Sequence, residues 1–176
     1  VDMQNDFIDG SLGTPEARAV VSAVCEKIRQ YPADHVIATR DTHQADYLQT
    51  SVGKYLPVEH CIYGTWGWEI CEEVSSSMPK ARIVDKPTFG SMQLAELLKG
   101  LAKEHAPEEG KEAPLEIELA GLCTDICVVT NALLLKTALP DAVIRVDGNC
   151  CAGVTPESHR AALLTMKMCQ VEVSGL

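Results

Sequence analysis

Short apolar runs and longer amphipathic stretches alternate along the chain. Residues 14–31 place apolar side chains three and four positions apart behind Thr14 and Pro15, which predicts a capped amphipathic helix. Further helices are expected near 68–77 and 92–104, after Cys127 and after Thr155. Buried strands are predicted for the apolar runs at 35–39, 81–84, 117–120, 142–146 and 170–173, with the end of a first strand at Val1-Asp2.

Strand and helix therefore alternate about six times without a break. This pattern predicts an α/β fold: a three-layer αβα, Rossmann-like, doubly wound arrangement around a mostly parallel six-stranded sheet. We expect one domain over residues 1–176, with its first strand truncated at the N-terminus. A polar surface linker is predicted at 105–114, and the irregular stretch 44–68 is expected to form a lid or pocket wall.

Four chemically capable side chains follow predicted strands. They are Asp2, Asp41, Lys86 and Cys127. In parallel sheets the carboxyl ends of the strands collect ligands and catalytic groups, so these side chains are expected at one edge.

Cys127 stands where an apolar run, a short polar turn and a helical pattern meet. A helix start offers unpaired N–H groups and a positive dipole end, both of which favour a thiolate over a thiol. Asp2 is the candidate base for this nucleophile, and Lys86 is the candidate cation. The alternative for Cys127 is the usual fate of a free cysteine, which is packing in an apolar core.

Composition narrows the classes of function. The net charge is −10 and aromatic residues make up 5%, without a basic run, which argues against a nucleic-acid partner or an anionic membrane surface. No apolar run reaches the roughly 18–20 residues that span a bilayer. The eight cysteines lack secretory marks and favour reduced thiols in a cytoplasm, with Cys150 and Cys151 packed in a strand-to-helix loop.

Five motifs occur in an order that resembles the isochorismatase-like cysteine hydrolases, specifically their nicotinamidase-related branch. The motifs are VDMQNDF at 1–7, TRDTH at 39–43, HCIYGTWG at 60–67, DKPTFGS at 85–91 and GLCTDICVVTNA at 121–132.

The resemblance implies a Rossmann-like fold with an Asp–Lys–Cys triad on Asp2, Lys86 and Cys127. The nucleophile of the family is the cysteine of the TDxCV element, which selects Cys127 over Cys123. The family pattern also implies a cis peptide bond between Leu122 and Cys123, and an oxyanion hole formed by the backbone N–H groups of Cys123 and Cys127.

The resemblance also implies a divalent metal ion, often zinc, held by Asp41, His43 and His60. One carboxylate and two imidazoles with open positions for water suit a catalytic metal. The alternative is that Asp41 caps a strand end and that both histidines are hydrogen-bonded loop residues. The chain departs from many nicotinamidases at 44–48, where a further histidine is replaced, and at 56–59, where Trp-Pro is replaced.

These residues favour hydrolysis of a small amide to a carboxylic acid and ammonia through a thioester. Phe7, Trp66 and Phe89 are the candidate aromatic walls of the substrate pocket, and packing is the alternative for each. The competing functions are an isochorismatase-type vinyl ether hydrolase and a catalytically silent binding or scaffold member. The resemblance also implies a homo-oligomer, a dimer or a tetramer.

Overall fold

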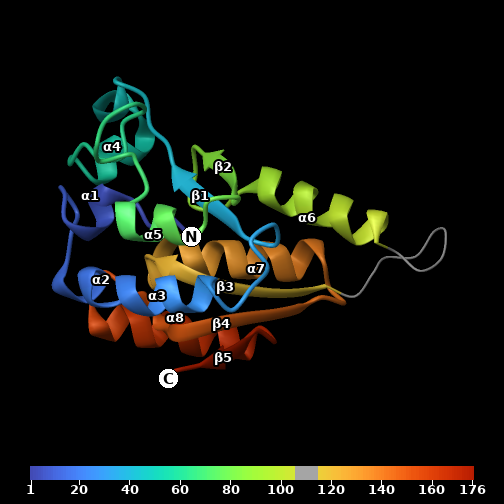
Figure 1. Cartoon of the computed structure of the whole chain (residues 1–176). Coiled ribbons are helices and arrows are strands. Elements are labelled where there is room, and N and C mark those ends of the chain that lie inside the picture. The colour runs from blue at the N-terminus through green and yellow to red at the C-terminus, as the bar shows by residue number, and fades with distance from the viewer. Residues whose placement is uncertain (106–114) are drawn as a thin grey trace.

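The computed structural model describes residues 1–105 and 115–176 (Figure 1), so most of the linker predicted at 105–114 lies outside it. Within the described residues, two sheets form, and every strand pair in them is parallel. In one, β1 (Ile37–Asp41) pairs with β2 (Arg82–Lys86). In the other, the order is β3 (Glu116–Leu122), β4 (Val143–Ala152) and β5 (Glu172–Ser174).

The first two residues connect the two sheets. The Asp2 N–H donates to the Thr39 carbonyl of β1 at 3.2 Å, and the Leu122 N–H of β3 donates to the Val1 carbonyl at 3.0 Å. The predicted α/β class with parallel strands is confirmed. The prediction of one six-stranded sheet is wrong, because Val1 and Asp2 provide too few backbone groups for a ladder between β1 and β3.

Helices cover both faces of the sheets, as Figure 1 shows for α3 and α7 on opposite sides of β3. The helix predicted at 14–31 is two helices, α2 (Pro15–Ala19) and α3 (Val21–Ile28), separated at Val20. The side chain of Thr14 accepts from the Ala17 N–H at 3.0 Å, as the cap prediction required. The first face also carries α1 (Asn5–Ile8) and α5 (Glu72–Ser77).

The other face carries α6 (Met92–Glu104), α7 (Val129–Ala138) and α8 (Pro156–Met168). Ser91 caps α6 by accepting from the Leu94 N–H at 3.1 Å. Thr155 and Ser158 form a capping box at the start of α8. Both caps fix helix starts at the end of the sheet where the candidate catalytic residues lie.

Apolar side chains separate into two clusters, one under each helical layer. The α6–α7–α8 side contains Val84, Leu94, Leu98, Leu119, Val128, Leu135, Ile144, Leu163 and Met166, among others. The opposite side contains Met3, Phe7, Val21, Val24, Ala38, Trp68, Val74 and Leu122, among others. The sheets therefore form the middle layer between two cores. Cys150 and Cys151 are buried as predicted, but they lie in β4 and not in a loop.

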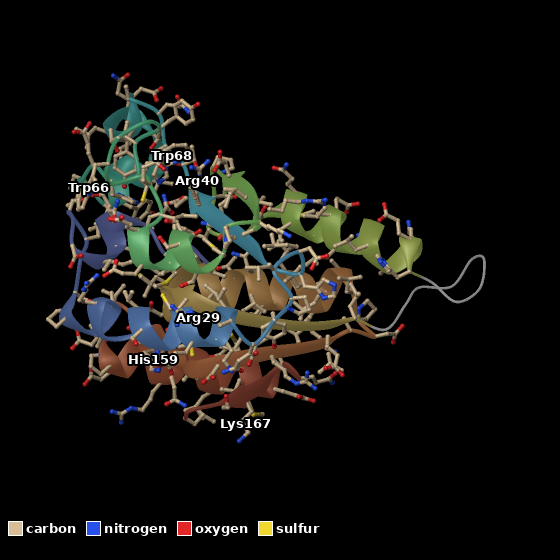
Figure 2. The ribbon with its side chains drawn as sticks, viewed as in Figure 1. Arg29, Arg40, Trp66, Trp68, His159 and Lys167 are labelled. Atoms are coloured by element: carbon tan, nitrogen blue, oxygen red, sulfur yellow. The ribbon has the colours of Figure 1, made fainter. Side chains whose placement is uncertain are left out.

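The stretch 44–68 is folded and contains a 3-10 turn, η1 (Tyr47–Gln49), and the short helix α4 (Ser51–Tyr55). It returns to the sheet at Trp68, whose indole N–H donates to the Thr42 hydroxyl at 2.9 Å. The Arg40 guanidinium lies 3.6 Å from the centroid of the Trp68 ring (Figure 2). These contacts attach the excursion to the carboxyl end of β1.

A cavity of about 270 Å³ lies between β1 and β3 beside Val1. Its walls are mainly apolar and include Ile37 and Ile117. Asp2 and Thr39 are among its lining residues, whereas Lys86 and Cys127 are not. In the part of the chain that is described, no helix combines the length and the apolarity needed to cross a bilayer.

The ammonium of Lys27 joins α3 to the second sheet. It lies 3.1 Å from a Glu118 carboxylate oxygen and 2.9 Å from one of Asp147. We expect Lys27→Met to lower the free energy of unfolding by about 2 kcal/mol at pH 7, because two partly buried carboxylates lose their cation. Urea unfolding of both proteins measures this difference, and Lys99→Met at an exposed i,i+3 pair is the matched control.

The same substitution has a pH signature. Burial is the largest influence and raises the pKa of Asp147, but the contacts with Lys27 and the Asn149 N–H together lower it more, and the net shift is downward. Such a carboxylate stabilises the fold above its unfolded pKa of about 4, and this stability is lost as the pH falls through the folded pKa. The difference between wild type and Lys27→Met should therefore shrink below pH 4. An unchanged difference at pH 3 would contradict this account.

Candidate active site and metal centre

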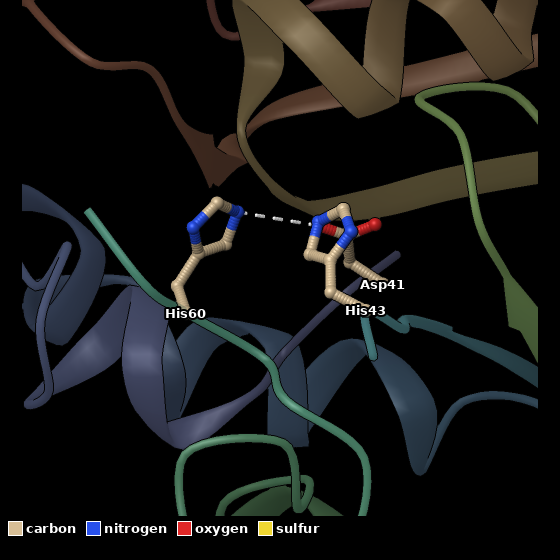
Figure 3. Close-up of side chains that lie close together, drawn as sticks. All are labelled: Asp41, His43 and His60. Carbon is tan, nitrogen blue, oxygen red and sulfur yellow. Dashed lines mark hydrogen bonds and ion pairs between the residues drawn. The ribbon is translucent and has the colours of Figure 1, made fainter. Parts of the chain in front are cut away.

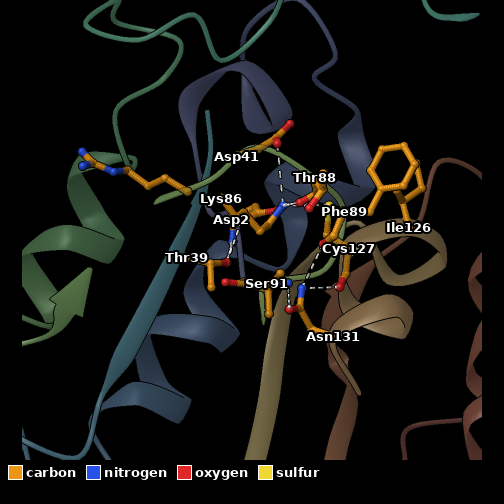
Figure 4. Close-up of polar contacts among 12 residues, drawn as sticks. Asp2, Thr39, Asp41, Lys86, Thr88, Phe89, Ser91, Ile126, Cys127 and Asn131 are labelled. Carbon is orange, nitrogen blue, oxygen red and sulfur yellow. Dashed lines mark hydrogen bonds and ion pairs between the residues drawn. The ribbon is translucent and has the colours of Figure 1, made fainter. Parts of the chain in front are cut away.

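Asp2, Lys86 and Cys127 come together at the carboxyl end of the strands (Figure 4). Lys86 is the last residue of β2, and its Nζ lies 2.7 Å from Asp2 Oδ2. The same Nζ lies 3.3 Å from Cys127 Sγ. All three side chains are buried. A carboxylate, an ammonium and a thiol therefore share one water-poor site.

Asp2 is held in position on both sides. Its backbone adopts φ 46°, a left-handed conformation that non-glycine residues seldom take. Its Oδ1 accepts from the Thr39 hydroxyl at 2.6 Å. Its Oδ2 meets Lys86 as an ion pair and receives no directed hydrogen bond from any described residue. That oxygen keeps a lone pair that can accept a proton.

Lys86 is completely buried, with 0% of the residue exposed. Burial lowers the pKa of its ammonium, but the charges of Asp2, Cys127 and Asp41 raise it more, so the net shift is upward. The ammonium also donates to the Thr88 carbonyl at 3.2 Å. Lys86 is therefore a fixed positive charge between the carboxylates and the sulfur.

The thiol of Cys127 differs from the prediction made from the helix start. Burial raises the pKa of this thiol well above its usual value, the Asp2 carboxylate adds to the rise, and Lys86 opposes it. The resting group is the thiol, because desolvation outweighs the effect of a helix N-terminus. A nucleophilic role for Cys127 would require a base, and the candidate is Asp2, whose carboxylate contacts the same ammonium.

Cys127 lies inside a helical turn and not at its first residue. The turn, η2 (Thr124–Val128), has π-helical hydrogen bonding and leads directly into α7. The peptide bond between Leu122 and Cys123 is cis. Asp125 accepts from the Val154 N–H at 3.0 Å and from the Ser158 hydroxyl, so it ties the turn to the start of α8. The Thr124 hydroxyl contacts His159 Nδ1 at 2.8 Å.

Asp41, His43 and His60 form a second cluster beside the first (Figure 3). Their potential ligand atoms all lie within 4.8 Å of one another. Asp41 Oδ2 is 3.0 Å from His43 Nε2 and 3.5 Å from His60 Nε2. The Nδ1 of His60 is 2.8 Å from the Val58 carbonyl, and in the tautomer that donates this hydrogen bond Nε2 can serve as a ligand. This donor set fits a divalent transition metal ion.

The two clusters share Asp41. Its Oδ1 is 3.7 Å from Lys86 Nζ, while its Oδ2 faces the histidines. Burial raises the pKa of Asp41, but the contacts with His43 and His60 outweigh it and hold the pKa well below its usual range. Asp41 is therefore an anion that faces both the lysine and the candidate metal position.

The three predicted pocket residues differ in exposure. Phe7 is buried, and its ring lies 5.6 Å from the ring of His60, so it packs against that histidine. Phe89 follows Lys86 in the chain, and the residue is 50% exposed. Trp66 is 63% exposed and lies in the excursion, seen in Figure 2. Phe89 is the aromatic residue of the three that combines nearness to Cys127 with an open face.

Sequence reasoning missed three buried polar residues that hold the site. Thr39 fixes Asp2, and Asn131 contacts the Cys127 carbonyl at 2.8 Å. The Gln4 amide binds the backbone of Asp41 on both sides, at 2.7 Å to its N–H and 2.8 Å to its carbonyl. Gln4 and Asn131 lie within quoted motifs, and a polar amide at an apolar position was the signal that could have found them.

A family model described as the isochorismatase domain matches residues 1–176. The chain belongs to the isochorismatase family. This confirms the family predicted from the five motifs. The family match covers the residues of the buried cluster, Asp2, Lys86 and Cys127.

Several relatives of this family member are similar along nearly the full chain. A nicotinamidase from Schizosaccharomyces pombe is 26% identical over 98% of this chain and 90% of that protein. The solved nicotinamidase of Bacillus subtilis is 25% identical, with a TM-score of 0.78, and the match covers 99% of this chain and 96% of that one. A pyrazinamidase of Pyrococcus horikoshii, solved in complex with zinc, is 23% identical with a TM-score of 0.76 over 99% and 96%.

The donor set of Asp41, His43 and His60 predicts that this family member binds Zn²⁺ in solution. We expect added Zn²⁺ to raise the unfolding midpoint of the wild-type chain, because a ligand that binds the folded state stabilises it. In His60→Ala, which removes one of three ligands, Zn²⁺ affinity should fall at least about 100-fold.

Calorimetric titration and thermal unfolding with and without Zn²⁺ measure both effects. His105→Ala, at an exposed histidine, is the control and should bind like the wild type. Equal Zn²⁺ affinity of His60→Ala and the wild type would contradict the assignment.

Proposed function

We propose that this chain is a nicotinamidase-like cysteine amidohydrolase, which converts a small amide into a carboxylic acid and ammonia. The observation that carries the proposal is the buried contact of Lys86 Nζ with both Asp2 Oδ2 and Cys127 Sγ, at 2.7 Å and 3.3 Å. Similarity to nicotinamidases from Schizosaccharomyces pombe and Bacillus subtilis supports the choice of an amide.

In the first half of the reaction, Asp2 accepts the proton of the Cys127 thiol as the sulfur attacks the amide carbonyl carbon. A carbon–sulfur bond forms, and the carbonyl π electrons move to oxygen. The carbonyl then re-forms, the carbon–nitrogen bond breaks, and the nitrogen takes the proton from Asp2 and leaves as ammonia. Lys86 stabilises the negative charge on sulfur and on Asp2 throughout.

In the second half, water hydrolyses the thioester. Asp2 accepts a proton from the water, the oxygen attacks the carbonyl carbon, and the carbon–sulfur bond breaks. The sulfur recovers a proton and the carboxylic acid leaves. We assign the oxyanion hole to the backbone N–H groups of Cys123 and Cys127, because Cys123 directly precedes the turn that carries the attacking sulfur of Cys127.

Asp41, His43 and His60 would hold a divalent ion, and zinc is the first candidate because the pyrazinamidase of Pyrococcus horikoshii was solved with it. When bound, such an ion supplies a Lewis acid and lowers the pKa of coordinated water. The chain itself presents the ligands: Gln4 fixes the Asp41 backbone, and the Val58 carbonyl orients the His60 ring.

The substrate is expected to be small and flat. Phe89 offers a half-exposed aromatic ring beside the nucleophile. Tyr47 is buried against the candidate metal ligands, with its ring 4.7 Å from the ring of His43 and 5.0 Å from the ring of His60. The Tyr47 hydroxyl donates to the Leu56 carbonyl at 2.9 Å and so points away from the ligand atoms. The predicted homo-oligomer stays a prediction.

An ammonia-release assay over small amides, beginning with nicotinamide and pyrazinamide, tests the function. We expect turnover by the wild type and a loss of at least about 1,000-fold in Cys127→Ala, because the substitution removes the sulfur that forms the thioester. Cys169→Ala, at an exposed thiol remote from the triad in sequence, is the matched control and should keep full activity.

Full turnover by Cys127→Ala would refute the mechanism. Release of pyruvate from isochorismate, without ammonia release from any amide, would instead assign the vinyl ether hydrolase. Inactivity on both substrate classes would favour the binding or scaffold role.

A further inference from the structure

Asn131 lies on α7, one helical turn after Cys127, and is completely buried at 0% exposure. Its side-chain amide makes three hydrogen bonds (Figure 4). The Nδ2 group donates to the Cys127 carbonyl at 2.8 Å and to the Phe89 carbonyl at 3.0 Å. The Oδ1 atom accepts from the Ser91 N–H at 2.9 Å. Two carbonyls and one N–H admit only this orientation of the amide.

These partners belong to different parts of the chain. Cys127 is in the nucleophile turn, whereas Phe89 and Ser91 belong to the loop that connects Lys86 to α6. The Thr88 carbonyl of this loop accepts from Lys86 Nζ at 3.2 Å. Loop and helix also pack closely at Gly90, where an added Cβ would lie 2.9 Å from Thr130 Cγ2. One buried amide therefore connects the segment of the lysine to the segment of the sulfur.

We infer that Asn131 is a positioning residue, which sets the distance between Cys127 Sγ and Lys86 Nζ by holding the lysine loop against the nucleophile turn. This inference rests on the proposed function for its kinetic consequence, but not for its geometry. The 3.3 Å contact joins Lys86, at the end of β2 in one sheet, to Cys127, which follows β3 of the other sheet. Besides the Lys86–Cys127 contact itself and the packing at Gly90, the three bonds of Asn131 supply a direct connection between those segments.

The hydrogen bonds of Asn131 also affect the position of Phe89. Its carbonyl is held by Asn131 while its side chain stays half exposed. The amide therefore also fixes the backbone from which the aromatic wall of the pocket extends. Loss of the bridge should alter the alignment of sulfur, ammonium and aromatic wall together.

Two variants of Asn131 distinguish its hydrogen bonds to the lysine loop from its hydrogen bond within the helix. In Asn131→Ser, the hydroxyl can still bond to the Cys127 carbonyl four residues earlier, but it is too short to keep both loop contacts. In Asn131→Leu, all three bonds are lost while the branching of the side chain at Cγ is kept. Ser91→Ala is the matched control, because it removes the buried cap of α6 and leaves the Ser91 N–H and the Asn131 amide in place.

The first readout is steady-state ammonia release. We expect kcat to fall about 10- to 100-fold in both Asn131 variants with KM changed less than about threefold, since misplaced reacting groups affect the transition state more than binding. Ser91→Ala should match the wild type in kcat even where its unfolding midpoint is lower.

The second readout does not need a substrate. The rate of Cys127 alkylation by iodoacetamide is followed against pH in a Cys169→Ala background, with mass spectrometry to locate the label. The charged groups around the sulfur are Lys86, Asp2, Asp41 and the Val1 amino group. A displaced ammonium should move the midpoint of the profile upward by at least about 0.5 pH unit, whereas a change of access alters only the plateau rate.

The two proposals fail in different ways. A wild type that releases no ammonia overturns the proposed function, and the alkylation profile still decides the role of Asn131. A folded Asn131→Ser with wild-type kcat and midpoint overturns the positioning role. If neither variant folds while Ser91→Ala does, Asn131 serves general stability and the inference is also overturned.

Discussion

The buried ammonium of Lys86 is the interaction on which the rest of the site depends. Removing this charge from water is costly, and only close anions and hydrogen-bond acceptors offset the cost. Asp2 at 2.7 Å, Asp41 at 3.7 Å and the Thr88 carbonyl at 3.2 Å provide them. Each comes from a different segment, so the fold must bring several chain ends to one point.

Parallel topology meets that demand. Lys86 ends β2, Asp41 ends β1, and Asp2 lies between β1 and β3, so one edge of the sheets collects all three. Buried polar side chains then fix the separate members: Thr39 holds Asp2, Gln4 holds the backbone of Asp41, and Asn131 holds the nucleophile turn. The side-chain amides of Gln4 and Asn131 use both N–H groups and the oxygen in hydrogen bonds, which fixes their orientation.

Asp41 links the two chemical centres. One carboxylate oxygen faces Lys86 and the other faces His43 and His60. The triad and the candidate metal position are therefore neighbours that share an anion. This arrangement explains why the excursion that carries His60 is tied to the end of β1 through Trp68 and Arg40, since a loose excursion would separate the imidazole from the carboxylate.

The amino-acid sequence by itself determined the class of fold, the family, and the side chains that meet at the strand ends, because periodicity and motif order are local properties. The tertiary structure decided the pKa direction of the Cys127 thiol and the hydrogen bonds that hold the site residues in place. The helix start at Cys127 suggested a thiolate, but burial makes the resting group a thiol. The roles of Thr39, Gln4 and Asn131 depend on partners up to 64 residues away, and only packing brings those partners within hydrogen-bonding distance.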